Sequence, residues 1–119
     1  MSQVLADLFG TSATESGSTI TINVGDFINK QGQAYLSSPD TATAESKLAA
    51  FLAWLHWSQM PATDANGIVA VDKTKAIVPQ QSFQPKTFEV REDETQLKTE
   101  FGFAVYTVDN TGFDPSQTV

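Results

Sequence analysis

Apolar residues follow a helical spacing in the middle of the chain and an alternating spacing elsewhere. The segment from Leu48 to Trp57 reads Leu-Ala-Ala-Phe-Leu-Ala-Trp-Leu-His-Trp and is the only long apolar run. Its alanines and leucines favour helix, and a Met-Pro pair follows that would end one. We therefore predict one central helix over about 41–60, preceded by a cap at Ser38, Asp40 or Thr41.

Within this helix, the spacing of three and four residues predicts an apolar stripe that faces the core. The stripe consists of Ala44, Leu48, Phe51, Leu52 and Leu55. Trp54 and Trp57 lie roughly opposite, so a sheet packed on the stripe would leave them uncovered. The run has only about half of the roughly 20 apolar residues that a membrane span needs. We expect the two tryptophans to be covered by a curled sheet, by a ligand or by a second subunit.

Alternating apolar and polar residues predict strands on both sides of the helix. The predicted strands are 19–24, 68–71, 74–78, 86–91 and 97–108. In the last strand, Leu97, Thr99, Phe101, Phe103 and Val105 share a face that is apolar enough for the core. Gly102, on the other face, is expected to mark a bend that lets the sheet curve. Residues 27–36 fit either a short strand or a turn. The expected fold class is α+β: a curved, mainly antiparallel sheet packed on the central helix.

A short N-terminal helix is predicted as well. Val4, Leu5, Leu8 and Phe9 have helical spacing, and Gly10 follows as a stop. A helix this short needs a surface on which to dock, either its own core or a neighbouring subunit. We expect residues 1–119 to form a single domain, with a helix and polar linker over 1–18 and a loosely ordered tail over 109–119.

Charge and composition narrow the classes of function. The net charge of −7 disfavours binding to nucleic acid and to anionic membranes. The chain has no cysteine, so disulfides and thiolate zinc sites are excluded. It begins with neither a basic region nor a long apolar segment, so no secretory signal is expected. A soluble, cytoplasmic protein is the resulting expectation.

Candidate chemistry is sparse. His56 is the only histidine, and a lone histidine without an identified acidic partner is a weak signal for a general base. The acidic turn Glu92-Asp93-Glu94 lacks the spacing of a calcium loop and is expected to be solvated. No phosphate-binding glycine loop occurs. We therefore expect no metal and no cofactor.

Three functions remain, in order of preference. The first is a non-catalytic, self-associating or assembly protein, whose partner is a copy of itself or another protein. Its contacts would come from the N-terminal helix (Val4, Leu5, Leu8 and Phe9) and from the tryptophan face. The second is a small-ligand module with an aromatic pocket between helix and sheet. That pocket would be lined by Trp54, Trp57, Phe101, Phe103 and Tyr106. The third is a small enzyme that uses His56 with a carboxylate.

Overall fold

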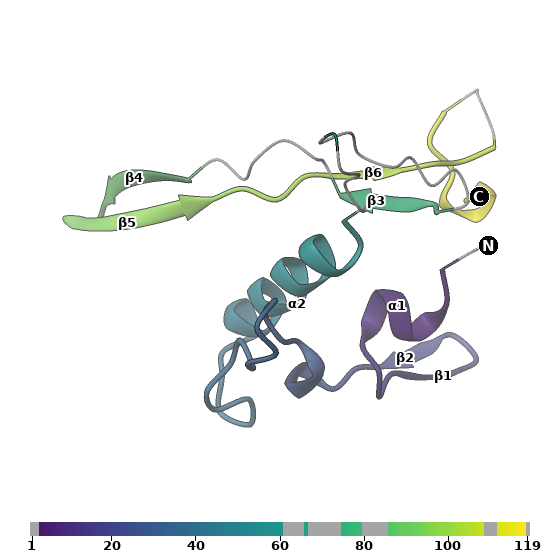
Figure 1. The fold of residues 1–119 in the computed structure, drawn as a ribbon, viewed down its shortest axis with the longest axis horizontal. Helices are drawn as coiled ribbons and strands as arrows, with labels where there is room; N and C mark the ends of the chain where they lie inside the picture. Colours follow the sequence, from purple (N-terminus) through teal and green to yellow (C-terminus); the bar gives the residue numbers. More distant parts are fainter. Residues whose placement is uncertain (1–2, 61–65, 67–74, 80–85, 109–111, 119) are drawn as a thin grey trace.

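The computed structural model describes residues 3–60, 66, 75–79, 86–108 and 112–118. It confirms an α+β fold with one main helix, a short N-terminal helix and antiparallel strands (Figure 1). The helices are α1 (Leu5–Phe9) and α2 (Ala44–Ser58), with 3-10 turns η1 (Val24–Asp26) and η2 (Pro115–Gln117). The strands are β1 (Thr14–Ser16), β2 (Thr19–Thr21), β3 (Ile77–Pro79), β4 (Lys86–Arg91), β5 (Glu94–Thr99) and β6 (Phe103–Val105). No helix in these ranges is long and apolar enough to cross a bilayer.

The central helix begins three residues later than the expected start at 41. The side-chain oxygen of Thr43 accepts a hydrogen bond from the Ser46 N–H at 3.1 Å and caps the helix. None of the three predicted caps holds this position. The reason is a separate turn just upstream, in which the Thr41 N–H donates to the Ser38 carbonyl at 3.2 Å. Glu45 lies in the first turn, where its charge suits the helix dipole.

The described strands form three two-stranded antiparallel ladders, β1–β2, β3–β6 and β4–β5. The strand predicted over 97–108 is split into β5 and β6, and Gly102 lies at the interruption, where a bend was expected. The predicted strand 68–71 lies outside the described residues. β1 lies inside the segment expected to be a linker, because Gly17 takes a φ of +57° and turns the chain back onto β2. In the C-terminal tail, Thr118 forms a bridge with Thr107.

The core covers only part of the apolar stripe predicted on α2, at Phe51 and Leu55, and extends from there to the tryptophan face. The buried cluster consists of Phe27, Ala50, Trp54 and Leu55, with Phe51 and Trp57 packed against it. Leu48, at the centre of the predicted stripe, is 57% exposed, whereas Trp54 is 7% exposed. The prediction for Leu48 is therefore wrong. The physical reason is that residues 24–28 supply a large aromatic ring, and burying Trp54 against it removes more apolar area from water than burying a leucine.

α2 lies between the N-terminal segment on one side and the β3–β6 ladder on the other (Figure 1). Two glutamines hold these layers together. The Gln3 amide nitrogen donates to Gln59 Oε1 at 2.7 Å and to the Ile77 carbonyl at 2.9 Å. Gln3 Oε1 accepts from the Ile77 N–H at 2.9 Å, and the buried Gln59 donates to the Asp7 carbonyl at 2.9 Å. The Gln3 side chain thus pairs with β3 as a neighbouring strand would.

Candidate functional site

The tryptophan face is covered by the chain itself. The Phe27 ring lies 5.1 Å from Trp54 and 5.2 Å from Phe51, between centroids. The Trp57 indole N–H donates to the Ile28 carbonyl at 2.8 Å. Residues 27–36, left open as strand or turn, form a turn closed by the Ile28–Ala34 bridge. Neither a curled sheet nor a second subunit is needed to cover these rings.

The N-terminal helix docks on its own core. The Phe9 ring stacks on Phe51 with centroids 6.0 Å apart and planes inclined by 6°. Leu8 packs against the buried cluster, and Leu5 is half-buried. Val4 alone of the four predicted contact residues is exposed. Of the two alternatives for this helix, the structure has the intramolecular one, which leaves little of its apolar surface for a partner.

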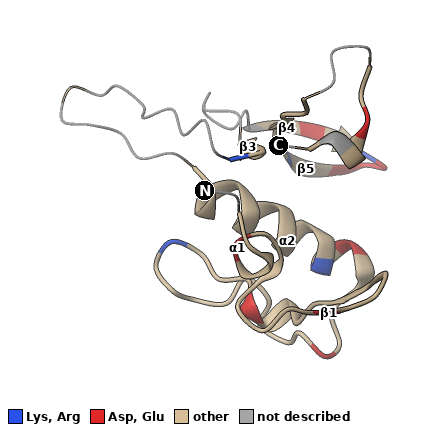
Figure 2. Cartoon of the chain, turned by 90° about the vertical axis from the view of Figure 1, so that its right-hand side faces the viewer, with Lys and Arg blue, Asp and Glu red and all other residues tan. Residues whose placement is uncertain are grey.

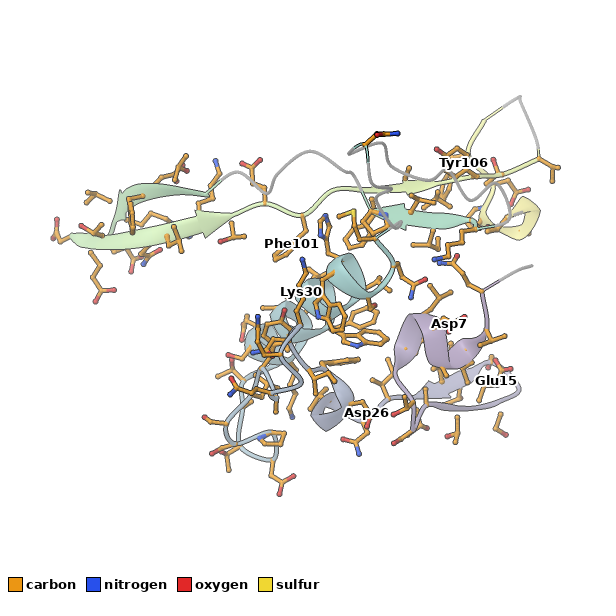
Figure 3. All side chains as sticks on the ribbon, viewed as in Figure 1. Asp7, Glu15, Asp26, Lys30, Phe101 and Tyr106 are labelled. Atoms are coloured by element: carbon orange, nitrogen blue, oxygen red, sulfur yellow. The ribbon has the colours of Figure 1, made fainter. Side chains whose placement is uncertain are left out.

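His56 is enclosed by aromatic rings. It is 4% exposed, and the rings of Phe101 and Phe103 both approach it edge-on with centroids at 5.6 Å. Phe101 lies between the β5–β6 connection and α2, whereas Tyr106 lies exposed at the far end of β6 (Figure 3). Of the five residues predicted to line a pocket, Trp54, Trp57 and Phe103 meet at the buried cluster, Phe101 lies beside His56, and Tyr106 is exposed. An imidazole covered in this way is poorly placed to reach a substrate.

The β4–β5 hairpin presents an apolar face to solvent. Its register pairs Phe88 with Leu97 and Val90 with Thr95, so these four side chains lie on one side. Phe88 is 76%, Val90 74% and Leu97 53% exposed. We call Phe88, Val90 and Leu97 the hairpin face. The hairpin extends away from both helices (Figure 1), so its apolar side chains contribute little to the core.

The opposite face of the hairpin is charged. Lys98 Nζ lies 3.2 Å from Glu89 Oε1 and 3.1 Å from Glu100 Oε1. Hydrogen bonds to Glu100 and Glu89 raise the pKa of Lys98 above its ordinary value. A depression in the hairpin is lined by residues of both faces: Glu89, Arg91, Gln96, Leu97, Lys98 and Thr99. Acidic residues colour both strands, whereas most of α2 is uncharged (Figure 2). The hairpin is therefore amphipathic, with a solvated charged face and an uncovered apolar one.

The turn of this hairpin is strained. Glu92 and Asp93 have φ angles of +50° and +63°, a region that costs about 1–2 kcal/mol for a residue with a side chain. Within the described ranges, no group of three or more Asp, Glu, His or Cys residues is arranged to hold a metal ion. A two-stranded hairpin with such a turn is marginally stable in water on its own.

The hairpin face was missed from sequence, although the alternation in 86–91 and around Leu97 was visible. Alternation shows that a strand has an apolar face but not whether the same chain covers that face. Comparison of the chain with family models, with curated protein sequences and with solved structures finds no match.

Proposed function

We propose that the protein is a non-catalytic assembly subunit that associates with copies of itself. One observation carries the proposal. Among the described residues, five apolar residues are buried, whereas twelve large apolar side chains are exposed. Monomeric proteins rarely expose apolar surface that is contiguous over several side chains, and such surface marks contacts with other molecules.

The proposal assigns the contact to the hairpin face rather than to the tryptophans or to α1. Trp54, Leu8 and Phe9 are engaged in the protein's own core, so they have little surface left to offer. The hairpin face has three large side chains that are each more than half exposed. A partner that covers them would remove apolar surface from water and would also stabilise a hairpin that is otherwise marginal.

The proposal also includes the class of partner and the location of the protein. A net charge of −7 supports a protein partner over nucleic acid, because phosphate backbones repel an acidic surface. A cytoplasmic location is compatible with a chain that has no cysteine. The ligand hypothesis has less support, because Trp54, Trp57 and Phe103 pack into the core and Tyr106 is exposed. The enzyme hypothesis has less support, because His56 is covered by Phe101 and Phe103.

Sedimentation velocity at tens of micromolar tests the proposal. We expect the wild-type protein to sediment as a dimer or larger species. The double variant Phe88→Ser/Leu97→Ser should dissociate at least tenfold more readily, since each buried apolar contact contributes more than about 1 kcal/mol. Phe113→Ser is the matched control, because Phe113 is equally exposed but lies in the C-terminal tail. A wild-type protein that is monomeric throughout this range would refute the proposal.

A further inference from the structure

We propose, on the basis of the assembly function above, that β5 pairs edge to edge with β5 of a second copy. The two strands run antiparallel about a two-fold axis at Gln96. The result is one four-stranded sheet in the order β4–β5–β5–β4. The occupant of the free edge is therefore a second copy of this chain, and the contact is closed and symmetric.

The edge of β5 is available for such pairing. Within the described residues, β4 and β5 form a sheet of two strands, so each strand has one paired side. Arg91 and Glu94 flank the two-residue turn and pair with each other. Because pairing alternates along an antiparallel ladder, the backbone groups of Thr95 and Leu97 point away from β4. No other described strand pairs with these groups, so they can pair with the same two residues of a second strand.

The side chains of β5 are complementary to themselves in this register. Its sequence from 94 to 98 is Glu-Thr-Gln-Leu-Lys. With Gln96 opposite Gln96, each Glu94 faces Lys98 of the other copy, and each Thr95 faces Leu97. Opposite charges thus meet at both ends of the contact, which stabilises cross-strand pairs.

Two other symmetric registers are less favourable. An axis at Leu97 would place Glu94 opposite Glu100, and an axis at Glu89 on the β4 edge would place that carboxylate opposite itself. Like charges directly opposite each other destabilise a sheet. A shift of one residue in only one strand would bring the charged face of one hairpin next to the apolar face of the other. Among these three registers, only the axis at Gln96 places opposite charges directly opposite each other.

Lys98 has the capacity to join the contact. An ammonium group has three donors, and Glu89 and Glu100 account for two partners of Lys98. The third donor of Lys98 can therefore bind Glu94 of the other copy. Two chains with a net charge of −7 each repel each other. A contact in which Lys98 of each copy faces Glu94 of the other offsets part of this repulsion.

Edge pairing also explains how the hairpin is stabilised. It converts two marginal two-stranded units into one sheet of four strands, above the three that a sheet with an apolar face needs. A two-fold axis perpendicular to the sheet keeps both hairpin faces on the same side. Phe88, Val90 and Leu97 of the two copies then form one continuous apolar surface, which the edge contact itself does not cover and which stays available for the contact proposed above.

Charge exchange between two variants tests the register. Glu94→Lys places lysine opposite Lys98, and Lys98→Glu places glutamate opposite Glu94, so each variant alone should associate about tenfold or more weakly than wild type. A mixture of the two variants should recover association as a heterodimer, because each Lys then faces a Glu. Glu15→Lys has the same change in charge as Glu94→Lys but lies on β1, and it should leave association unchanged. If the mixture associates no better than its components, the inference is wrong.

A crosslink tests the axis independently. The chain has no cysteine, so Gln96→Cys introduces a single thiol that faces its own copy across the axis. We expect rapid formation of a disulfide-linked dimer under mild oxidation, and slow formation for the exposed control Lys30→Cys. If the wild-type protein associates but Gln96→Cys crosslinks no faster than the control, this inference fails and the assembly function stands. If the wild-type protein is monomeric, both fail. Circular dichroism confirms that each variant is folded.

Discussion

Replacement of Phe27 by alanine tests the most consequential feature of the core, the covering of the tryptophans by residues 24–28. Phe27 is 1% exposed, and its ring contacts Trp54 and Phe51. Truncation of a buried phenylalanine to alanine costs about 3–5 kcal/mol. Two aromatic pairs at about 0.5–1.5 kcal/mol each account for part of this value. Since a domain of this size is stable by about 5–15 kcal/mol, Phe27→Ala should remove a large fraction of the free energy of unfolding.

The assay is denaturation by urea, monitored by tryptophan fluorescence. The emission of the folded variant should also shift to longer wavelength, because Trp54 gains access to water. Leu48→Ala is the informative control. The apolar stripe predicts a loss of about 2–5 kcal/mol for a buried leucine, whereas a leucine that is 57% exposed should lose less than about 1 kcal/mol.

Protein concentration must be the same for all variants, because association adds to apparent stability. A Phe27→Ala variant that loses less than about 1 kcal/mol would refute the arrangement of the core. A Leu48→Ala variant that loses more than Phe27→Ala would show that the sequence stripe, and not the tryptophan face, is buried.

Three further perturbations concern the backbone and one carboxylate. Gly10→Ala should lower the free energy of unfolding by about 1–3 kcal/mol, measured in urea, because Gly10 has a φ of +107° that favours glycine. Glu92→Asn/Asp93→Gly should stabilise the hairpin by about 1 kcal/mol and slow its amide exchange, since this pair suits positive φ. Hydrogen bonds from Ser116 hold the pKa of Asp114 below its ordinary value of 3.8. Ser116→Ala should therefore raise that pKa in an NMR titration.

Gly10→Ala has a matched control, and the pH dependence that Asp114 contributes has a defined direction. Gly17→Ala is matched to Gly10→Ala, because its φ is also positive but no atom lies within 4 Å of the added carbon. It should cost less than Gly10→Ala, whose new carbon would lie 3.1 Å from Asp26. The lowered pKa of Asp114 means that its stabilising contribution is present above the ordinary pKa and is lost as pH falls through the folded value. An unchanged Asp114 titration in Ser116→Ala would contradict this assignment.

Local patterns in the sequence determined α1, α2 and β4, whereas the strand predicted over 19–24 ends at Thr21 and β1 was not predicted. The apolar run identified α2 to within three residues at its start, because helix propensity and the terminal proline act locally. Gly10 ended α1 where expected, and alternation identified β4 with its observed bounds. The single histidine was judged a weak catalytic candidate, and its enclosure by two phenylalanines is compatible with that judgement.

Only the tertiary structure decided which faces are covered. Leu48 and Trp54 lie about 120° apart around one helix, and both faces are apolar. Helical periodicity cannot choose between them, because the choice depends on Phe27, more than twenty residues away in the chain. The same holds for the hairpin, where Phe88 alternates like a core residue and yet lies in solvent. Burial depends on contacts between distant segments, and a local pattern does not show which distant segment packs against a given face.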